Sequence, residues 1–364
     1  MKEVMNKIHK IISLVILMTM LLPNMSANAG NDDRRGTAGA GELLINPWAR
    51  SAGWSNVNTA NGTGLDALFT NVAGLGHTSG TEFYFNYSHY LNNSDIGIIA
   101  VGLSQNLGNY GVLGLSVNSM NFGKISRVTT NAPEPTGATF KPSLMNLGLS
   151  YAKAFSSTIY AGITLKLINE GIDNVTATGV GFDAGIQYIT GDDYEIKFGI
   201  SLKNWGPSMS FSGDGLAVMA TIQDADYRQT VEHRSLEWEL PSSLNIGASY
   251  DFLFSEKEYR LTVAGNYESM AFAKDLYTAG LEYGFKDLFM VRCGYTYQGG
   301  GTNDIYTNTD KTNFSSGFTA GASVNATISK GKGNKRSKDL SIDYAYRTTV
   351  ILGGIHTVGV RLSL

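Results

Sequence analysis

The chain has 364 residues, with 28 Lys and Arg against 31 Asp and Glu, so its formal net charge is −3. Charged residues make up 16% of the sequence, against roughly 25% in an ordinary soluble domain, whereas glycine supplies 43 residues and tyrosine 19. This near-neutral balance excludes a general nucleic-acid binder, because phosphate backbones need many Lys and Arg residues. The single cysteine, Cys293, excludes a disulfide framework and a cysteine-rich metal site. Few charges, abundant glycine and tyrosine, and no internal apolar run of about 18 residues indicate a transmembrane β-barrel.

The first 29 residues have the pattern of a secretory signal peptide. Basic residues, among them Lys2 and Lys10, precede an apolar run over 11–22, and Ala27-Asn28-Ala29 follows as a small-x-small cleavage site. The apolar run is too short to span a membrane as a helix. We therefore expect cleavage after Ala29 and a mature protein that leaves the cytoplasm.

From residue 81 to residue 364 the chain divides into segments in which apolar and polar residues alternate. A strand that crosses a membrane needs about 9–11 residues, with apolar side chains toward lipid and polar side chains toward the lumen. In the last segment, for example, Val358 and Val360 alternate with Gly359 and Arg361. The sequence predicts an all-β fold, a transmembrane antiparallel β-barrel of about fourteen strands. The predicted strands are 81–91, 95–105, 110–122, 140–155, 157–172, 175–190, 194–205, 242–255, 258–270, 276–287, 288–298, 315–329, 340–350 and 355–364.

Charged side chains fall at the polar positions of several predicted strands. A charge at every second position is costly in a packed sandwich of two sheets, whereas it is typical of a water-filled barrel lumen. The charged residues expected to face the lumen are Lys197, Arg260, Glu268, Glu282, Arg292, Asp343, Arg347 and Arg361.

The lengths of the connections predict the orientation in the membrane. Links after even-numbered strands are mostly tight, whereas several links after odd-numbered strands are long, at 123–139, 206–241 and 299–314. Outer-membrane barrels have short periplasmic turns and longer outer loops. We therefore expect a protein of the outer membrane of a diderm bacterium with both termini in the periplasm. The long basic turn Lys330–Asp339 is the exception, and we interpret it as a solvated tip rather than a partner site.

Two predicted strands carry apolar residues on both faces, at 96–103 and 112–117. One explanation is that the N-terminal segment packs against these strands from inside the barrel. The other is an apolar lumen or side opening that accepts a hydrophobic ligand or peptide. Glycines within both strands fit either explanation, because they allow another backbone to approach closely.

Residues 30–80 do not have the pattern of a spanning strand. A moderately apolar segment of this length cannot lie unpaired in lipid, so we expect it to plug the lumen or close its periplasmic mouth. Arg50 is a candidate for pairing with a lumen carboxylate and holding the plug, a structural role. The other candidate plug residues are Trp48, Trp54 and Asn71.

Short motifs in this segment resemble those of a known family. The elements Ala49-Arg50-Ser51-Ala52-Gly53 and Asn71 to Leu75, a first strand rich in Tyr and Phe, and the ending Leu340 to Tyr346 followed by Gly354-Ile355-His356 are similar to the PorV/PorQ family. These are outer-membrane proteins of the type IX secretion system, related in fold to the FadL long-chain fatty-acid transporters. The resemblance covers about residues 38–364.

The resemblance implies a fourteen-stranded barrel with an N-terminal plug. It also implies that the protein binds the C-terminal sorting signal of exported cargo and carries it from the translocon to the surface-attachment complex. The implied partners are a secretion translocon subunit and cargo C-terminal signal domains, with outer-membrane lipid around the barrel. The alternative is a FadL-like channel for long-chain fatty acids or other hydrophobic small molecules, which the two-sided apolar strands motivate.

Catalytic and cofactor motifs are absent from the sequence. There is no G-x-S-x-G nucleophile elbow, and no two histidines outside the signal fall at metal-ligand spacing. We therefore expect a non-enzymatic protein with no cofactor and no metal.

Overall fold

The computed structural model describes residues 34, 36–91, 94–128, 133–134, 137–221, 227–254, 258–298, 317–329, 338–349 and 353–364. The expected signal peptide, the predicted loop 299–314 and most of the basic turn after residue 329 lie outside these residues. No helix in the described ranges is long and apolar enough to cross a membrane.

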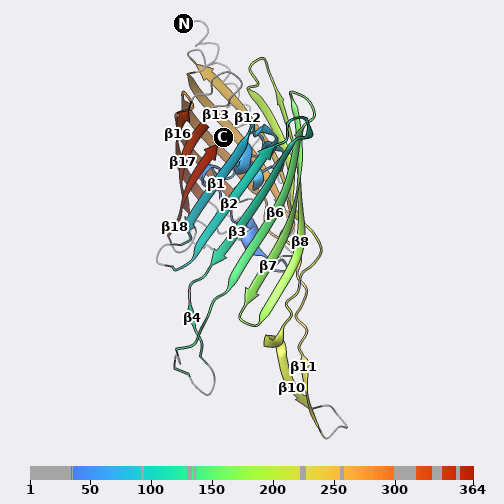
Figure 1. Cartoon of the computed structure of the whole chain (residues 1–364). Helices are drawn as coiled ribbons and strands as arrows, with labels where there is room; N and C mark the ends of the chain where they lie inside the picture. The colour runs from blue at the N-terminus through green and yellow to red at the C-terminus, as the bar shows by residue number, and fades with distance from the viewer. Residues whose placement is uncertain are drawn as a thin grey trace.

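Within the described ranges, fourteen strands form one closed antiparallel barrel, which confirms the predicted fold class (Figure 1). The first barrel strand closes against the last, with Phe85 opposite Val360. The predicted boundaries differ from the observed ones by at most three residues. The barrel strands are β1 (Thr81–His89), β2 (Gly97–Asn106), β3 (Val112–Asn121), β6 (Ser143–Ala154), β7 (Ile159–Ile172), β8 (Val175–Thr190), β9 (Ile196–Trp205), β12 (Ser243–Phe254), β13 (Tyr259–Met270), β14 (Leu276–Phe285), β15 (Phe289–Gln298), β16 (Gly317–Ser329), β17 (Lys338–Thr348) and β18 (Gly354–Ser363).

Side chains along each barrel strand alternate between an apolar exterior and a buried interior. On β9, Phe198 and Ile200 are 49% and 54% exposed, whereas Ser201 and Lys203, at the alternate positions of the same strand, are buried. Successive side chains of a strand point to opposite faces of the sheet, so the two-residue repeat in the sequence becomes an apolar outer belt. This belt is the surface that lipid covers in a membrane barrel.

Two of the long loops contain short hairpins that the sequence analysis did not predict. Strand β4 (Ile125–Ser126) pairs with β5 (Thr139–Phe140), and β10 (Ala217–Thr221) pairs with β11 (Arg228–Glu232). A short 3-10 helix, η6 (Asp214–Leu216), precedes β10. Figure 1 shows β4, β10 and β11 beyond one end of the barrel, and the C-terminus at the opposite end.

The N-terminal segment, residues 36–80, runs through the inside of the barrel from the long-loop end to the other end. Near its start, the amide of Gly39 donates to the carbonyl of Glu239 at 3.0 Å, just before β12. At its end, the carbonyl of Gly80 accepts from the amide of Asn106 at 2.9 Å, where β2 ends. The segment contains four short helices, η2 (Gly41–Leu44), α2 (Ala49–Ala52), η3 (Gly64–Leu68) and η4 (Val72–His77).

Apolar side chains of this segment pack on the inner face of the first barrel strands. Trp48, Leu65 and Leu75 are at most 1% exposed and form one cluster with inward residues that include Ala100 and Val112. Burial of these side chains fixes the segment against β1, β2, β3 and β6.

Inward-facing glycines make room for the N-terminal segment around the barrel wall. A Cβ atom on Gly199 would lie 2.3 Å from the carbonyl oxygen of Thr59, and one on Gly162 would lie 2.8 Å from the carbonyl oxygen of Val72. A side chain at either position would therefore collide with backbone. The high glycine content thus has a packing cause. Glycines at which a Cβ would similarly lie 3.0 Å or less from the segment are Gly102, Gly114, Gly185, Gly247, Gly280, Gly294 and Gly321.

Candidate functional site: the inner pocket

A network of ion pairs and hydrogen bonds occupies the inner wall of β13 to β17. The Glu282 carboxylate accepts from Arg292 Nε at 2.9 Å and from Arg260 Nη2 at 3.0 Å. Arg292 Nη1 donates to the Ser323 hydroxyl at 2.7 Å, and this hydroxyl donates to Asp343. Each buried charge in this chain of contacts has a partner, as low-polarity surroundings require.

The remaining charged residues predicted to face the lumen also lie on the inner face. Lys197 pairs with Asp251 at 2.6 Å, and Lys203 pairs with Glu268 at 3.5 Å. Arg361 Nη1 lies 3.7 Å from a carboxylate oxygen of Glu82. Arg347 is 4% exposed.

The expected water-filled lumen is wrong for this part of the wall. Glu282, Arg292 and Asp343 are at most 2% exposed, because the N-terminal segment and neighbouring charges cover them. The alternation predicted which way these side chains point, but it contained no information on their partners.

The four predicted plug residues contact the barrel wall. Trp48 stacks on Tyr84 of β1 with ring centroids 5.3 Å apart, and the indole of Trp54 occupies the space left by Gly280. Asn71 Nδ2 donates to the carbonyl of Ile186 at 3.0 Å. The Asn71 side chain also caps η4, because its Oδ1 accepts from the Ala73 amide at 3.1 Å.

Arg50 is half-buried beside the ion-pair network. Burial lowers the pKa of Arg50, and the Glu282 and Asp66 carboxylates oppose that shift. Burial likewise raises the pKa of Asp66, which accepts from the Ser51 amide at 2.9 Å, and Arg50 opposes the shift. The carboxylates that act on Arg50 are thus Glu282 of the wall and Asp66 of the segment itself, and a direct pair between Arg50 and a lumen carboxylate stays a prediction.

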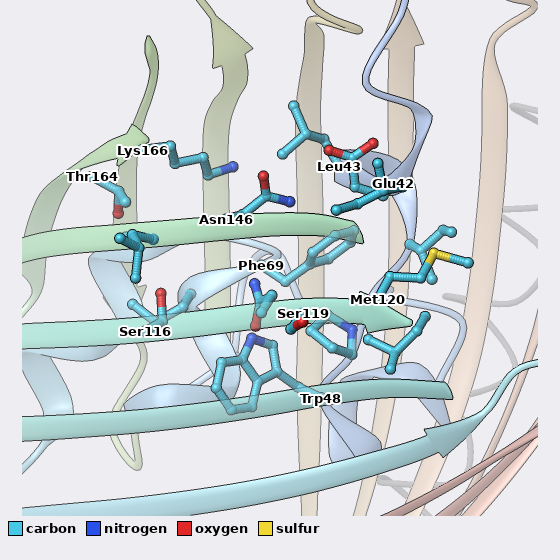
Figure 2. Close-up of a pocket in the computed structure, with 18 residues that line it drawn as sticks. Glu42, Leu43, Trp48, Phe69, Ser116, Ser119, Met120, Asn146, Thr164 and Lys166 are labelled. Carbon is cyan, nitrogen blue, oxygen red and sulfur yellow. The ribbon is translucent and has the colours of Figure 1, made fainter. Parts of the chain in front are cut away.

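Opposite this network lies a pocket between the N-terminal segment and the inner faces of β2, β3, β6 and β7 (Figure 2), which we call the inner pocket. It contains about 50 Å³ of water-accessible space. A cavity of this size holds a few water molecules. Its apolar side chains include Leu43, Ile45, Pro47, Trp48, Leu68, Phe69, Ile98, Met120, Leu144 and Leu147.

A cluster of buried apolar side chains lies between the inner pocket and the long-loop end of the barrel. Ile98 and Met120 line the pocket and also belong to a buried cluster with Tyr90 and Ile355 near the ends of β1 and β18. Phe122, just beyond β3, packs against the same cluster. Ala100 and Val112 pack on the segment, as the first explanation expects, whereas Ile98 and Met120 line the pocket. Acceptance of a hydrophobic ligand, the second explanation, stays a prediction.

Polar residues also line the pocket, and the sequence pattern predicted none of them as site residues: Glu42, Ser116, Asn118, Ser119, Asn146, Thr164 and Lys166. Asn118 of β3 lies directly opposite Asn146 of β6. Figure 2 shows Asn146 between Lys166 and Glu42 in that view. Lys166 Nζ lies 2.6 Å from Asp183 Oδ2 and 2.7 Å from an amide oxygen of β9. The signal in the sequence was a polar residue, Asn118, at an inward position of an otherwise two-sided apolar strand.

Glu42 gives the pocket a titratable group near neutral pH. Burial, reinforced by the nearby Glu170 carboxylate, raises the pKa of Glu42 to about 7. Asn146 donates a hydrogen bond to Glu42, which opposes the shift. Among the residues that the structure describes, no group of three or more His, Cys, Asp or Glu side chains is placed to hold a metal ion.

Comparison with protein-family models finds no match, and comparison with curated proteins finds no significant match. Solved structures do match. A deltaS2S3 mutant of the monoaromatic hydrocarbon channel TodX has a TM-score of 0.53 at 13% identity, covering 86% of this chain and 97% of that one.

Two further structures each cover 87% of this chain and 97% of their own, with a TM-score of 0.50. They are the Ralstonia pickettii toluene transporter TbuX, 11% identical, and a Pseudomonas aeruginosa FadL homologue, 9% identical. Identities this low show the fold alone. The chain has the fold of FadL-like outer-membrane barrels.

Proposed function

We propose that this protein is an outer-membrane channel for small hydrophobic molecules and that the inner pocket lies on their route. The observation that carries the proposal is the apolar lining of the inner pocket, in which Ile98 and Met120 also belong to a buried apolar cluster toward the long-loop end. The solved structures described as a hydrocarbon channel and a toluene transporter support it, because they share the fold.

The asymmetry of the loops supports an orientation with the β10–β11 hairpin outside the cell. Long loops of outer-membrane barrels face outward and short turns face the periplasm. The apolar cluster then lies toward the outer end, where hydrophobic molecules arrive.

The size of the pocket limits how molecules pass. About 50 Å³ of water-accessible space is too small for a hydrocarbon such as toluene, so side chains must move to admit one. Phe69 and Trp48 come from the N-terminal segment rather than from the sheet. We therefore propose that the segment, and not the barrel wall, yields when a molecule enters.

A role in type IX secretion remains a prediction from the short motifs. The residues that carry this resemblance, such as Asn71 and Gly53, contact the barrel wall inside the lumen. These contacts hold the N-terminal segment against the wall, which any barrel with a plug of this shape requires. They therefore do not favour cargo binding over channel function.

Uptake by cells tests the proposal. Cells that produce the protein in their outer membrane should accumulate labelled toluene faster than cells without it. Met120→Gln places a polar group of similar length on the apolar lining, and we expect it to slow uptake several-fold. Met145→Gln is the matched control, because Met145 is 37% exposed on the outer face.

Equal uptake with and without the protein would show that it is not such a channel. In the native host, secretion of cargo bearing the sorting signal should continue after the gene is deleted. Loss of that secretion together with unchanged uptake would favour the type IX role.

A further inference from the structure

We infer that the inner pocket selects small apolar molecules whose polar end donates a hydrogen bond, such as a phenol or an alcohol. This inference rests on the proposed channel function and specifies the chemistry of its ligand. It follows from the kind of polar atoms that the pocket leaves without partners.

Two amide oxygens of the pocket-lining side chains lack a hydrogen-bond partner, and an amide oxygen is always an acceptor. Asn118 Oδ1 and Asn146 Oδ1 are buried, and within the described structure neither of them has a hydrogen-bond partner. Asn146 is itself 8% exposed. Because Asn118 and Asn146 lie directly opposite each other on adjacent strands, their side chains project from neighbouring points of the inner wall.

A buried acceptor without a partner costs free energy that a suitable donor recovers. A hydroxyl group supplies one donor, and its oxygen can in turn accept from a side-chain amide such as that of Asn118. A methyl group supplies no donor, and a carboxylate supplies only further acceptors. Among ligands of equal size, the hydroxyl compound therefore matches the pocket best.

The one cation of the pocket does not reverse this preference. Lys166 Nζ already contacts Asp183 and Asn204, at 2.6 Å and 2.7 Å. A carboxylate ligand would also meet the carboxyl group of Glu42, whose negative charge the nearby Glu170 carboxylate already disfavours. The pocket is thus unfavourable for a fatty-acid or benzoate anion despite its lysine.

The apolar side favours a flat or slender ligand body. Trp48 and Phe69 present aromatic rings, with Pro47 and Leu68 beside them. Figure 2 shows Trp48 near the bottom of the view, Lys166 and Glu42 near the top, and Phe69 between them. An aromatic ring with a hydroxyl at one end therefore places its ring on Trp48 and Phe69 and its donor on the asparagines.

Three para-substituted toluenes test the inference on the full mature chain in detergent. They are p-cresol, p-xylene and p-toluate, which differ only in a hydroxyl, a methyl and a carboxylate. Binding is measured by calorimetry, and each affinity is expressed relative to the partition of the same compound into protein-free micelles. On this scale we expect p-cresol to bind about tenfold tighter than p-xylene, the effect of one well-made hydrogen bond, with p-toluate weakest.

Variants with side chains of similar volume test whether Asn118 and Asn146 cause the preference for p-cresol over p-xylene. Asn118→Leu and Asn146→Leu each remove one acceptor, and we expect either to bring the cresol-to-xylene ratio close to one. Asn169→Leu is the control, because Asn169 lies on the outer face of β7. It should leave the ratio unchanged.

The outcomes separate this inference from the channel function. If p-xylene binds as tightly as p-cresol, or if p-toluate binds tightest, the selectivity is wrong while the channel stands. If the ratio survives in both asparagine variants, the acceptors are not its cause and the inference is overturned. If none of the three compounds binds and toluene uptake does not depend on the protein, the channel function itself is wrong.

Discussion

At Gly199 the backbone of the barrel wall and the backbone of the N-terminal segment approach so closely that no side chain fits between them. A Cβ atom there would lie 2.3 Å from the Thr59 oxygen and 2.8 Å from the Ala60 Cα. Backbone cannot rotate away as a side chain can, so the added methyl group must displace the segment.

Gly199→Ala should therefore destabilise the folded barrel by about 1–3 kcal/mol, the usual cost of overpacking. The temperature at which the folded form is lost on an SDS gel measures the change. Gly171→Ala is the control, because a Cβ there meets nothing closer than 3.8 Å. Equal effects of the two substitutions would contradict the packing explanation.

Glu42 should make the stability of the folded chain depend on pH. Its pKa rises from 4.5 to about 7 in the folded protein, so the folded state keeps a proton that the unfolded state releases. The retained proton contributes its full stabilisation of the folded state below pH 4.5. This contribution declines as the pH rises above 4.5 and is lost once the pH has passed 7. Thermal unfolding between pH 4.5 and 8 should show the decline.

Glu42→Gln is the control for this dependence, since glutamine keeps the shape of the side chain but does not titrate. It should give a flatter stability curve between pH 4.5 and 7 than the parent chain. Parallel curves would assign the pH dependence to another group.

The alternation of residues predicted which side chains face inward, including Arg292 and Asp343, because a strand has a strict two-residue repeat. It did not predict their partners, which depend on register between strands and on the covering segment. The pocket residues Glu42 and Asn146 were missed for the same reason. These two residues matter because they line the same pocket in the folded chain, and nothing in the sequence around either residue indicates that they come together.

Among the secondary-structure elements, the barrel strands were predicted closely because lipid on one side and a buried face on the other impose the same pattern on each. The hairpins β4–β5 and β10–β11 were missed because no such constraint acts on a loop. Their outward residues carry no regular pattern, as in β11, where all five residues are exposed.

The β10–β11 hairpin should be dispensable for the barrel. Its strands pair with each other and not with a barrel strand. Replacing residues 217–232 by a short Gly-Ser linker should leave the unfolding temperature unchanged, since Met209 and Trp238 still pair below the cut. A clear drop in that temperature would show that the hairpin supports the barrel.

For the whole molecule, the apolar belt is the feature that commits the chain to a membrane. Ile200 is 54% exposed in the middle of β9, between the inward positions Gly199 and Ser201. Ile200→Arg should cost about 2–4 kcal/mol if this position lies at the bilayer midplane, because the charge must enter lipid. Folding into vesicles at graded urea concentrations measures the loss.

Leu236→Arg is the control for this prediction, because Leu236 is 89% exposed in the loop beyond β11. It should have little effect on folding. If both substitutions were equally harmless in vesicles, the exposed side chains of β9 would not face lipid.

The seam between β1 and β18 determines the order in which the molecule can be assembled. Glu82 pairs with Ser363, so the cylinder cannot shut until the end of the polypeptide is in place. The N-terminal segment packs on the inner face of β1, β2, β3 and β6. If this packing precedes the β1–β18 pairing, closure of the barrel encloses the segment, and no later insertion through either mouth is required.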